Sequence, residues 1–422
     1  MVATVSLAFA ALGQQSVRTP DVPPFTKFVP NPEDQTVVRA GPFSGTAGVG
    51  MGYLYTDNAN TTQTGKLSLN EIFESLNVDL DWPLSPFNRI DLSLGGQLQQ
   101  NFYSNGSQGL NLAISPDSQI QLQARVGEFL LTAFERFTIL QDPVSDPAVG
   151  GQTNLNRVTN TIGAGVELPL YRADFGLTFS YTYSDQFGGT SGGTSVSASE
   201  GGVLLNSFHL GSKIAFQLSP SLGYGLEVNA TYNAGDGPAD FYAFSMGPFI
   251  RGHITHLVEL DASIGPLLTA GPAGGPPGYY ATLAIRYQLS RLLQLLAGVD
   301  HDSEFSSGLG VTQNNNLRLS VEANVTRRCV ITVGPYINFG TVITGELPGQ
   351  YTQVGVSTQV AYLFTKRLSA NISYRFTKRN GQVATESGVS GVFGGSALSG
   401  VFPGSGQSYT QNQVSVAFNY NF

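Results

Sequence analysis

The chain has 422 residues, a formal net charge of -8 and one cysteine, and only 12% of its residues are charged, about half the share in a soluble globular domain. So little charge argues against a soluble fold, and the acidic balance argues against nucleic-acid binding, because no basic stripe is present to neutralise phosphates. The 18 Tyr and 26 Phe residues argue against disorder, and no apolar run reaches the roughly 20 residues of a transmembrane helix.

The N-terminal region predicts export. Residues 1–11 are mostly apolar and carry the small-x-small pattern of Ala8, Phe9 and Ala10, which predicts a signal peptide over residues 1–10. No Lys or Arg precedes Arg18, so we expect a truncated signal or a mis-assigned start. Residues 11–42 are Pro-rich and predict an irregular periplasmic lead-in, followed by a transmembrane domain over residues 43–422.

From residue 43 onward, apolar and polar residues alternate with a period of two. The runs are as long as the roughly 9–11 residues that a tilted strand needs to cross a bilayer. A soluble β-sandwich also alternates, but its strands average about 5 or 6 residues and its polar face carries more Lys and Glu. Here the polar face is mainly Ser, Thr, Asn, Gln and Gly. The pattern predicts an all-β fold, a transmembrane antiparallel up-and-down β-barrel.

The connections between these runs alternate in length, which predicts short periplasmic turns and longer extracellular loops, with both termini periplasmic. The longer Gly-, Ser- and Asn-rich links are residues 186–204, 271–278 and 380–408. Eight short turns, together with a first and a last strand, predict about 18 strands. Residues 119–141 are too long for one strand, so 16 strands is the alternative. The short turns are expected at residues 83–86, 115–117, 169–171, 219–221, 252–253, 290–291, 326–328 and 365–367.

A barrel of this size leaves an aqueous channel unless something plugs it, and the residues before position 43 are too few and too Pro-rich to do so. We therefore expect an outer-membrane, porin-like channel for passive diffusion of small hydrophilic solutes, without catalytic activity, cofactor or metal. The Gly-rich residues 388–406 are interpreted as an external loop, with an infolded constriction as the alternative.

The selectivity of such a channel would come from charges that face inward. Their two signs are nearly balanced, which predicts weak ion selectivity. The residues that line the pore are identified by counting alternate positions along each predicted strand, and we call this criterion parity. The acidic residues Asp91 and Glu167 belong to this set. Its main members are Arg89, Arg125, Arg157, Lys213, Glu227, Arg251, Glu259, Asp261, Arg286, Arg318, Glu322 and Arg375.

The last strand ends in aromatic residues that share one face: Phe418, Tyr420 and Phe422. This ending resembles the C-terminal insertion signal of outer-membrane proteins, which the barrel assembly machinery reads. The expected partners are therefore that machinery, outer-membrane lipid and small hydrophilic solutes. Association into a homotrimer, as in many porins, is left open.

Several segments of the N-terminal half resemble the putative β-barrel porin 2 family of outer-membrane proteins. They are residues 50–58, 114–118, 134–137 running to 142–143, and 157–161. The resemblance covers about 150 residues, and the remainder matches only as a generic barrel. It implies a bacterial porin without an assigned substrate, and it supplies no catalytic or ligand-binding residues.

Other functions stay open at this stage. An occluded or polymer-exporting barrel, or an adhesin acting through its loops, would share the same pattern. A phospholipase-like hydrolase would use His301 to activate Ser303, with an asparagine across the same hairpin, Asn314, Asn315 or Asn316, to orient the histidine. His253 and His256 flank a turn and make a poor metal site by themselves.

Overall fold

The computed structural model describes residues 38–59, 66–115, 118–140, 156–187, 189–191, 194–196, 203–219, 221–235, 241–271, 277–306, 310–342, 349–383 and 408–422. The predicted signal peptide, most of the predicted lead-in and the Gly-rich residues 388–406 lie outside these ranges. No helix in the described ranges is long and apolar enough to cross a membrane.

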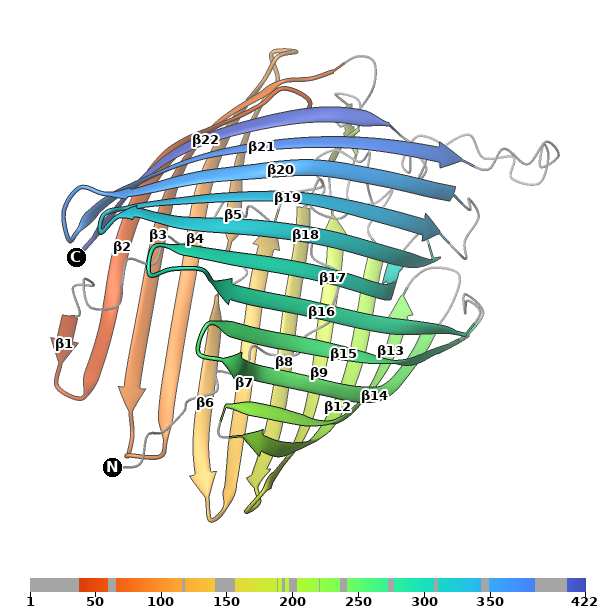
Figure 1. The fold of residues 1–422 in the computed structure, drawn as a ribbon. Helices are drawn as coiled ribbons and strands as arrows, with labels where there is room; N and C mark the ends of the chain where they lie inside the picture. Colours follow the sequence, from red (N-terminus) through yellow and green to blue (C-terminus); the bar gives the residue numbers. More distant parts are fainter. Residues whose placement is uncertain are drawn as a thin grey trace.

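The secondary structure consists of β-strands in antiparallel order (Figure 1). They are β1 Val38–Ala40, β2 Phe43–Thr56, β3 Leu69–Pro83, β4 Arg89–Tyr103, β5 Gln108–Ile114, β6 Gln119–Val126, β7 Phe129–Leu140, β8 Asn156–Pro169, β9 Ala173–Phe187, β10 Gly189–Ser191, β11 Thr194–Val196, β12 Val203–Ser219, β13 Leu222–Gly235, β14 Phe241–Thr255, β15 Val258–Ala270, β16 Gly278–Gln288, β17 Leu293–Ser306, β18 Gly310–Thr326, β19 Cys329–Val342, β20 Gly349–Leu363, β21 Leu368–Val383 and β22 Tyr409–Asn421.

The sheet closes on itself, because β2 pairs with both β3 and β22. β5 and β6 lie end to end and together fill one place in the ring, since both pair with β4 and both pair with β7. Among the described strands, the ring therefore has 18 positions, with β1 as a short addition to β2 and β10–β11 as a separate hairpin. The predicted barrel of about 18 strands is confirmed, and the alternative of 16 is wrong.

Two of the predicted turns are misplaced. The chain does not reverse between β5 and β6, where a turn was predicted at residues 115–117, because both strands run in the same direction along β4. The backbone N–H of Ser115 donates to the carbonyl of Gly95 at 2.8 Å, and that of Ser118 donates to Ser115 at 2.9 Å, so the strand is interrupted by a short kink. The reversal follows β6, at Gly127 with a φ of 62°. It divides the segment 119–141, which looked too long for one strand, into β6 and β7.

The second misplaced turn is residues 252–253, which lie inside β14. Gly252 has a φ of 131°, and the register with β15 shifts between His253 and Thr255. A β-bulge therefore stands where the sequence suggested a turn, and the reversal comes after Thr255. At the end of the barrel where β2 begins and β22 ends, called here the short-turn end, every connection between strands has two to five residues (Figure 1). At the opposite end the connections range from three residues, between β17 and β18, to 25 residues, between β21 and β22.

The predicted alternation decides which side chains face outward. In β2, the side chains of Val49, Met51 and Tyr53 are exposed, whereas Gly48 and Gly52 lie on the opposite, inner face. The same parity places exposed Leu, Ile, Phe and Tyr side chains around the outside of the ring. An outer surface this apolar matches the lipid-facing band of a transmembrane barrel.

Part of the glycine content follows from close packing on the inner face. Five aromatic rings lie across glycines that face them directly in the register: Phe73 over Gly52, Phe134 over Gly163, Tyr280 over Gly265, Tyr336 over Gly355 and Tyr351 over Gly340. At each of these glycines, an added Cβ would lie less than 3.0 Å from the ring. Glycine is needed there because any side chain would displace the ring.

Candidate functional site

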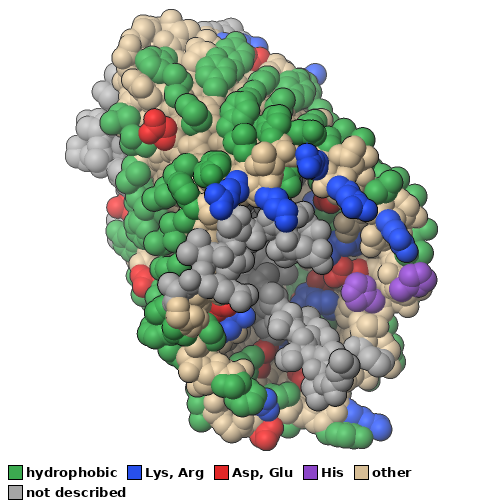
Figure 2. Space-filling model, turned by 90° about the vertical axis from the view of Figure 1, so that its left-hand side faces the viewer, with side chains coloured by type: hydrophobic (Ala, Val, Ile, Leu, Met, Phe, Trp, Pro, Cys, Tyr) green, Lys and Arg blue, Asp and Glu red, His purple; other side chains and the backbone are tan. Residues whose placement is uncertain are grey.

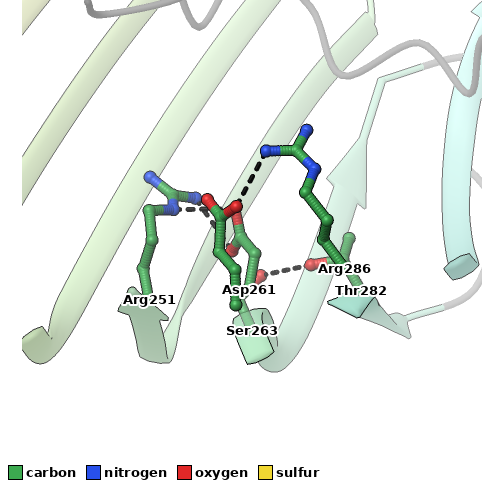
Figure 3. A network of polar contacts seen from close by, with 6 residues as sticks. Arg251, Asp261, Ser263, Thr282 and Arg286 are labelled. Atoms are coloured by element: carbon green, nitrogen blue, oxygen red, sulfur yellow. Dashed lines mark hydrogen bonds and ion pairs between the residues drawn. The ribbon is translucent and has the colours of Figure 1, made fainter. Parts of the chain in front are cut away.

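The inner face of the barrel carries ion pairs between neighbouring strands. Three consecutive strands, β14 to β16, hold one group of them (Figure 3). The guanidinium of Arg251 donates to both carboxylate oxygens of Asp261, at 2.7 and 3.1 Å, and Arg286 donates to Glu259 at 2.8 Å. Just beyond them, the hydroxyls of Ser263 and Thr282 are 2.8 Å apart. We call Arg251, Glu259, Asp261 and Arg286 the β14–β16 charge network.

This geometry follows from strand register. Arg251 lies directly opposite Asp261, and Glu259 lies directly opposite Arg286. In an antiparallel pair, opposed side chains point to the same face, so opposite charges meet without distortion of the backbone. The four side chains are between 36% and 52% exposed, so both ion pairs are partly accessible from the barrel interior.

Further ion pairs lie elsewhere on the inner wall, within one strand or between strands that do not place the two residues directly opposite each other. Arg89 binds Asp91 at 2.7 Å, Lys213 lies 3.7 Å from Glu167, and Arg318 lies 3.3 Å from Asp300. Arg89 also lies 3.9 Å from Asp81, so it has two carboxylate neighbours. Opposite charges held this close together largely cancel each other's field at a distance.

The remaining predicted residues are not members of these pairs, although Glu227 lies directly opposite Lys213 in the register of β12 and β13. Arg125 is at the end of β6, 4.0 Å from Glu128 in the following turn. Glu227 on β13 accepts a hydrogen bond from the Tyr280 hydroxyl at 3.3 Å. Glu322 shares the inner face of β18 with Arg318, closer to the short-turn end. Arg157 belongs to β8, but its side chain is outside the described part.

A cavity of about 180 Å³ lies on the wall formed by β6 to β14. Its lining includes the cations Arg136, Lys213 and Arg251 and the carboxylates Glu167 and Glu227. Parity analysis missed Arg136, although it occupies the inner face of β7 two residues from Phe134. Side chains of both signs at one cavity can hold water and polar solutes in several orientations.

The opposite wall, β18 to β22, is polar and largely uncharged. Asn338 and Gln353 are fully buried, as is Arg379, whose guanidinium carbon lies 4.1 Å from the centre of the Tyr351 ring. Arg375, predicted to line the pore, is only 2% exposed. Arg379 was missed, although the alternation that places Arg375 inside would also place Arg379 there four residues later.

The residues named for the hydrolase alternative are not in a catalytic arrangement. His301 stacks on Tyr279 with ring centres 4.0 Å apart. Its Nδ1 lies 2.7 Å from Oδ1 of Asn315, and its Nε2 lies 2.9 Å from the side-chain amide of Gln313. Both ring nitrogens are thus engaged by amides rather than by Ser303. Activation of a serine would require one nitrogen to accept the hydroxyl proton.

The described residues contain no group of three or more His, Cys, Asp or Glu side chains that could hold a metal ion. His253 and His256 lie at the short-turn end, beside the β-bulge in β14.

No protein-family model matches the chain, and no curated protein matches it. Among solved structures, it is similar to Pseudomonas aeruginosa OccK7 (OpdD), with 10% sequence identity and a TM-score of 0.46 over 90% of this chain and 98% of that chain. The corresponding values are 10%, 0.45, 90% and 98% for Pseudomonas aeruginosa OccK2 (OpdF) in complex with glucuronate. They are 7%, 0.45, 90% and 99% for Acinetobacter baumannii OccAB3.

These TM-scores are all below 0.5. The barrel architecture is shown by the closed ring of paired strands in this chain. The resemblance to the porin 2 family stays a prediction.

Proposed function

We propose that this chain is an outer-membrane channel through which small hydrophilic solutes diffuse passively with weak ion selectivity. The observation that carries the proposal is the closed ring of 18 strand positions with an apolar outside and paired charges inside. A ring of this size is wide enough for an aqueous lumen. The β14–β16 charge network supplies solvated groups along that lumen.

The proposal includes the orientation of the barrel. Short turns face the periplasm in outer-membrane barrels, which would put the short-turn end and the C-terminal strand there. Phe418 and Phe422 are exposed on the outer face of β22, at 45% and 49%. That exposure supports a role for these rings as an insertion signal for the assembly machinery.

The test is single-channel recording of the refolded chain in a planar bilayer, with the reversal potential measured across a KCl gradient. We expect stable conductance steps and a cation-to-anion permeability ratio near one, because the described ion pairs neutralise each other. A folded, membrane-inserted barrel that carries no current would overturn the open-channel proposal and favour an occluded barrel or a loop-based adhesin. Folding and insertion are checked independently, by the heat-dependent gel mobility of the barrel and by protease protection in vesicles.

A further inference from the structure

Three neighbouring connections at the short-turn end carry five cations and no carboxylate. They join β16 to β17, β18 to β19 and β20 to β21, and span residues 288–293, 326–329 and 363–368. We call these five exposed cations the basic arc: Arg291, Arg327, Arg328, Lys366 and Arg367. Figure 2 shows Lys and Arg side chains gathered along one part of the rim around the hollow at this end.

The basic arc differs from the charges on the inner wall, because none of its five cations forms an ion pair with a carboxylate of the described residues. Elsewhere on the same rim, cations have carboxylates close by in sequence, as Arg125 has Glu128 and Arg172 has Asp174. The positive charge is thus concentrated over one third of the strands instead of being spread around the mouth.

The arc also reaches the outer surface of the barrel rather than only its mouth. Nη1 of Arg367 lies 3.5 Å from the hydroxyl of Tyr420, and Nη1 of Arg328 lies 3.4 Å from the carbonyl of Phe364. Both aromatic side chains are exposed on the outside, at 38% and 45%. Exposed aromatic rings at the edge of an apolar band mark the level of lipid headgroups.

From these observations we infer that the basic arc binds phosphate-bearing anionic lipid headgroups of the leaflet at the short-turn end. Guanidinium groups match the geometry of phosphate oxygens and can donate two hydrogen bonds at once. The aromatic rings beside them would contact the glycerol and upper acyl region. The inference rests on the membrane placement proposed above but not on an open pore, so a missing conductance would leave it standing.

The test measures binding of phosphatidylglycerol and phosphatidylcholine to the full chain purified in a neutral detergent, by native mass spectrometry across a lipid titration. We expect the chain to bind phosphatidylglycerol more tightly than phosphatidylcholine. Each cation near an anionic lipid surface strengthens binding by roughly fivefold. The combined substitution of Arg327→Gln, Arg328→Gln, Lys366→Gln and Arg367→Gln should therefore weaken phosphatidylglycerol binding by at least tenfold.

Two variants control this experiment. Arg172→Gln removes a cation from the same rim outside the arc and should leave the binding unchanged. Arg327→Lys with Arg328→Lys and Arg367→Lys keeps the charge and should retain most of the preference. Equal binding of the two lipids, or unchanged binding in the Gln variant, would overturn the proposal. Complete displacement by an equal concentration of inorganic phosphate would assign the arc to free anions instead of lipid. Gel mobility with and without heating verifies that each variant is folded.

Discussion

The ring of Tyr351 lies across Gly340 on the inner wall, where the two residues face each other in the register of β19 and β20. A Cβ added at Gly340 would stand 2.1 Å from Cζ of that ring. The ring is held from two further sides, because its hydroxyl donates to Asn314 at 2.7 Å and the guanidinium of Arg379 lies 4.1 Å from its centre. Gly340 on β19 therefore leaves room for the Tyr351 ring, and this ring contacts Asn314 on β18 and Arg379 on β21.

Replacement of this glycine should destabilise the barrel. We expect Gly340→Ala to lower the free energy of unfolding by about 1–3 kcal/mol, the usual cost of overpacking, because Tyr351 cannot move without breaking its contacts. Reversible urea unfolding in lipid vesicles, followed by aromatic fluorescence, measures the change. Gly96→Ala is the matched control, since nothing lies within 4 Å of its added Cβ. Equal stability of the two variants would contradict the packing argument.

The β14–β16 charge network predicts the direction in which each charge-removing substitution shifts the ion selectivity. Arg286→Ala leaves Glu259 without its cation and should shift the permeability ratio toward cations, whereas Glu259→Gln should shift it toward anions. Both groups are solvated, with side-chain exposures of 52% and 36%. An interaction of this kind is worth about 0.5 kcal/mol, so each shift should be roughly twofold. Reversal potentials of the two single variants and the double variant measure it, and shifts of the same sign would refute the assignment.

A carboxylate faces outward within the apolar band. Glu74 is exposed on β3, between Ile72 and Leu76 on the same face, and lies opposite Met51 and Leu98 on the neighbouring strands. Charges on the lipid face destabilise transmembrane barrels, carboxylates less than lysine or arginine. We expect Glu74→Leu to stabilise the barrel by about 1 kcal/mol in vesicle unfolding experiments. Leu76→Glu should have the opposite effect. A loss of stability in Glu74→Leu would indicate that the carboxylate has a favourable partner in the membrane.

The kink between β5 and β6 depends on one hydroxyl. Oγ of Ser118 accepts a hydrogen bond from the backbone N–H of Gly95 at 2.9 Å and lies 3.2 Å from the carbonyl of the same residue. Ser118 is 3% exposed, so its loss would leave a buried donor unpaired. We expect Ser118→Ala to cost about 1–3 kcal/mol and to speed hydrogen exchange at Gly95. Ser107→Ala, in the exposed turn before β5, serves as the control and should leave exchange at Gly95 unchanged.

The hydrogen bonds of His301 predict the absence of lipase activity. Because amides engage both ring nitrogens, Ser303 has no base in contact with its hydroxyl among the described residues. We expect release of fatty acid from phospholipid micelles to stay at background in the folded chain, with and without calcium, and to be the same in Ser303→Ala. Turnover that disappears in Ser303→Ala would show that the site rearranges into a catalytic pair.

The sequence by itself determined the strand faces, the class of fold and the approximate number of strands. Alternation is a local property, because consecutive side chains of a strand point to opposite sides whatever the partner strand is. Parity was therefore sufficient to assign Arg251, Asp261 and Arg286 to the inner face. It would also have assigned Arg379, had the alternation been followed to the end of β21.

Only the tertiary structure decided which residues meet. Arg286 and Glu259 are 27 positions apart in the chain, and Asn58 and Thr410, joined by a hydrogen bond, are 352 apart. Such contacts depend on strand register and on closure of β2 against β22, and neither can be read from the period of one strand. The kink between β5 and β6 and the bulge in β14 escaped prediction for the same reason, because pairing with neighbouring strands decides whether a turn-like sequence reverses the chain.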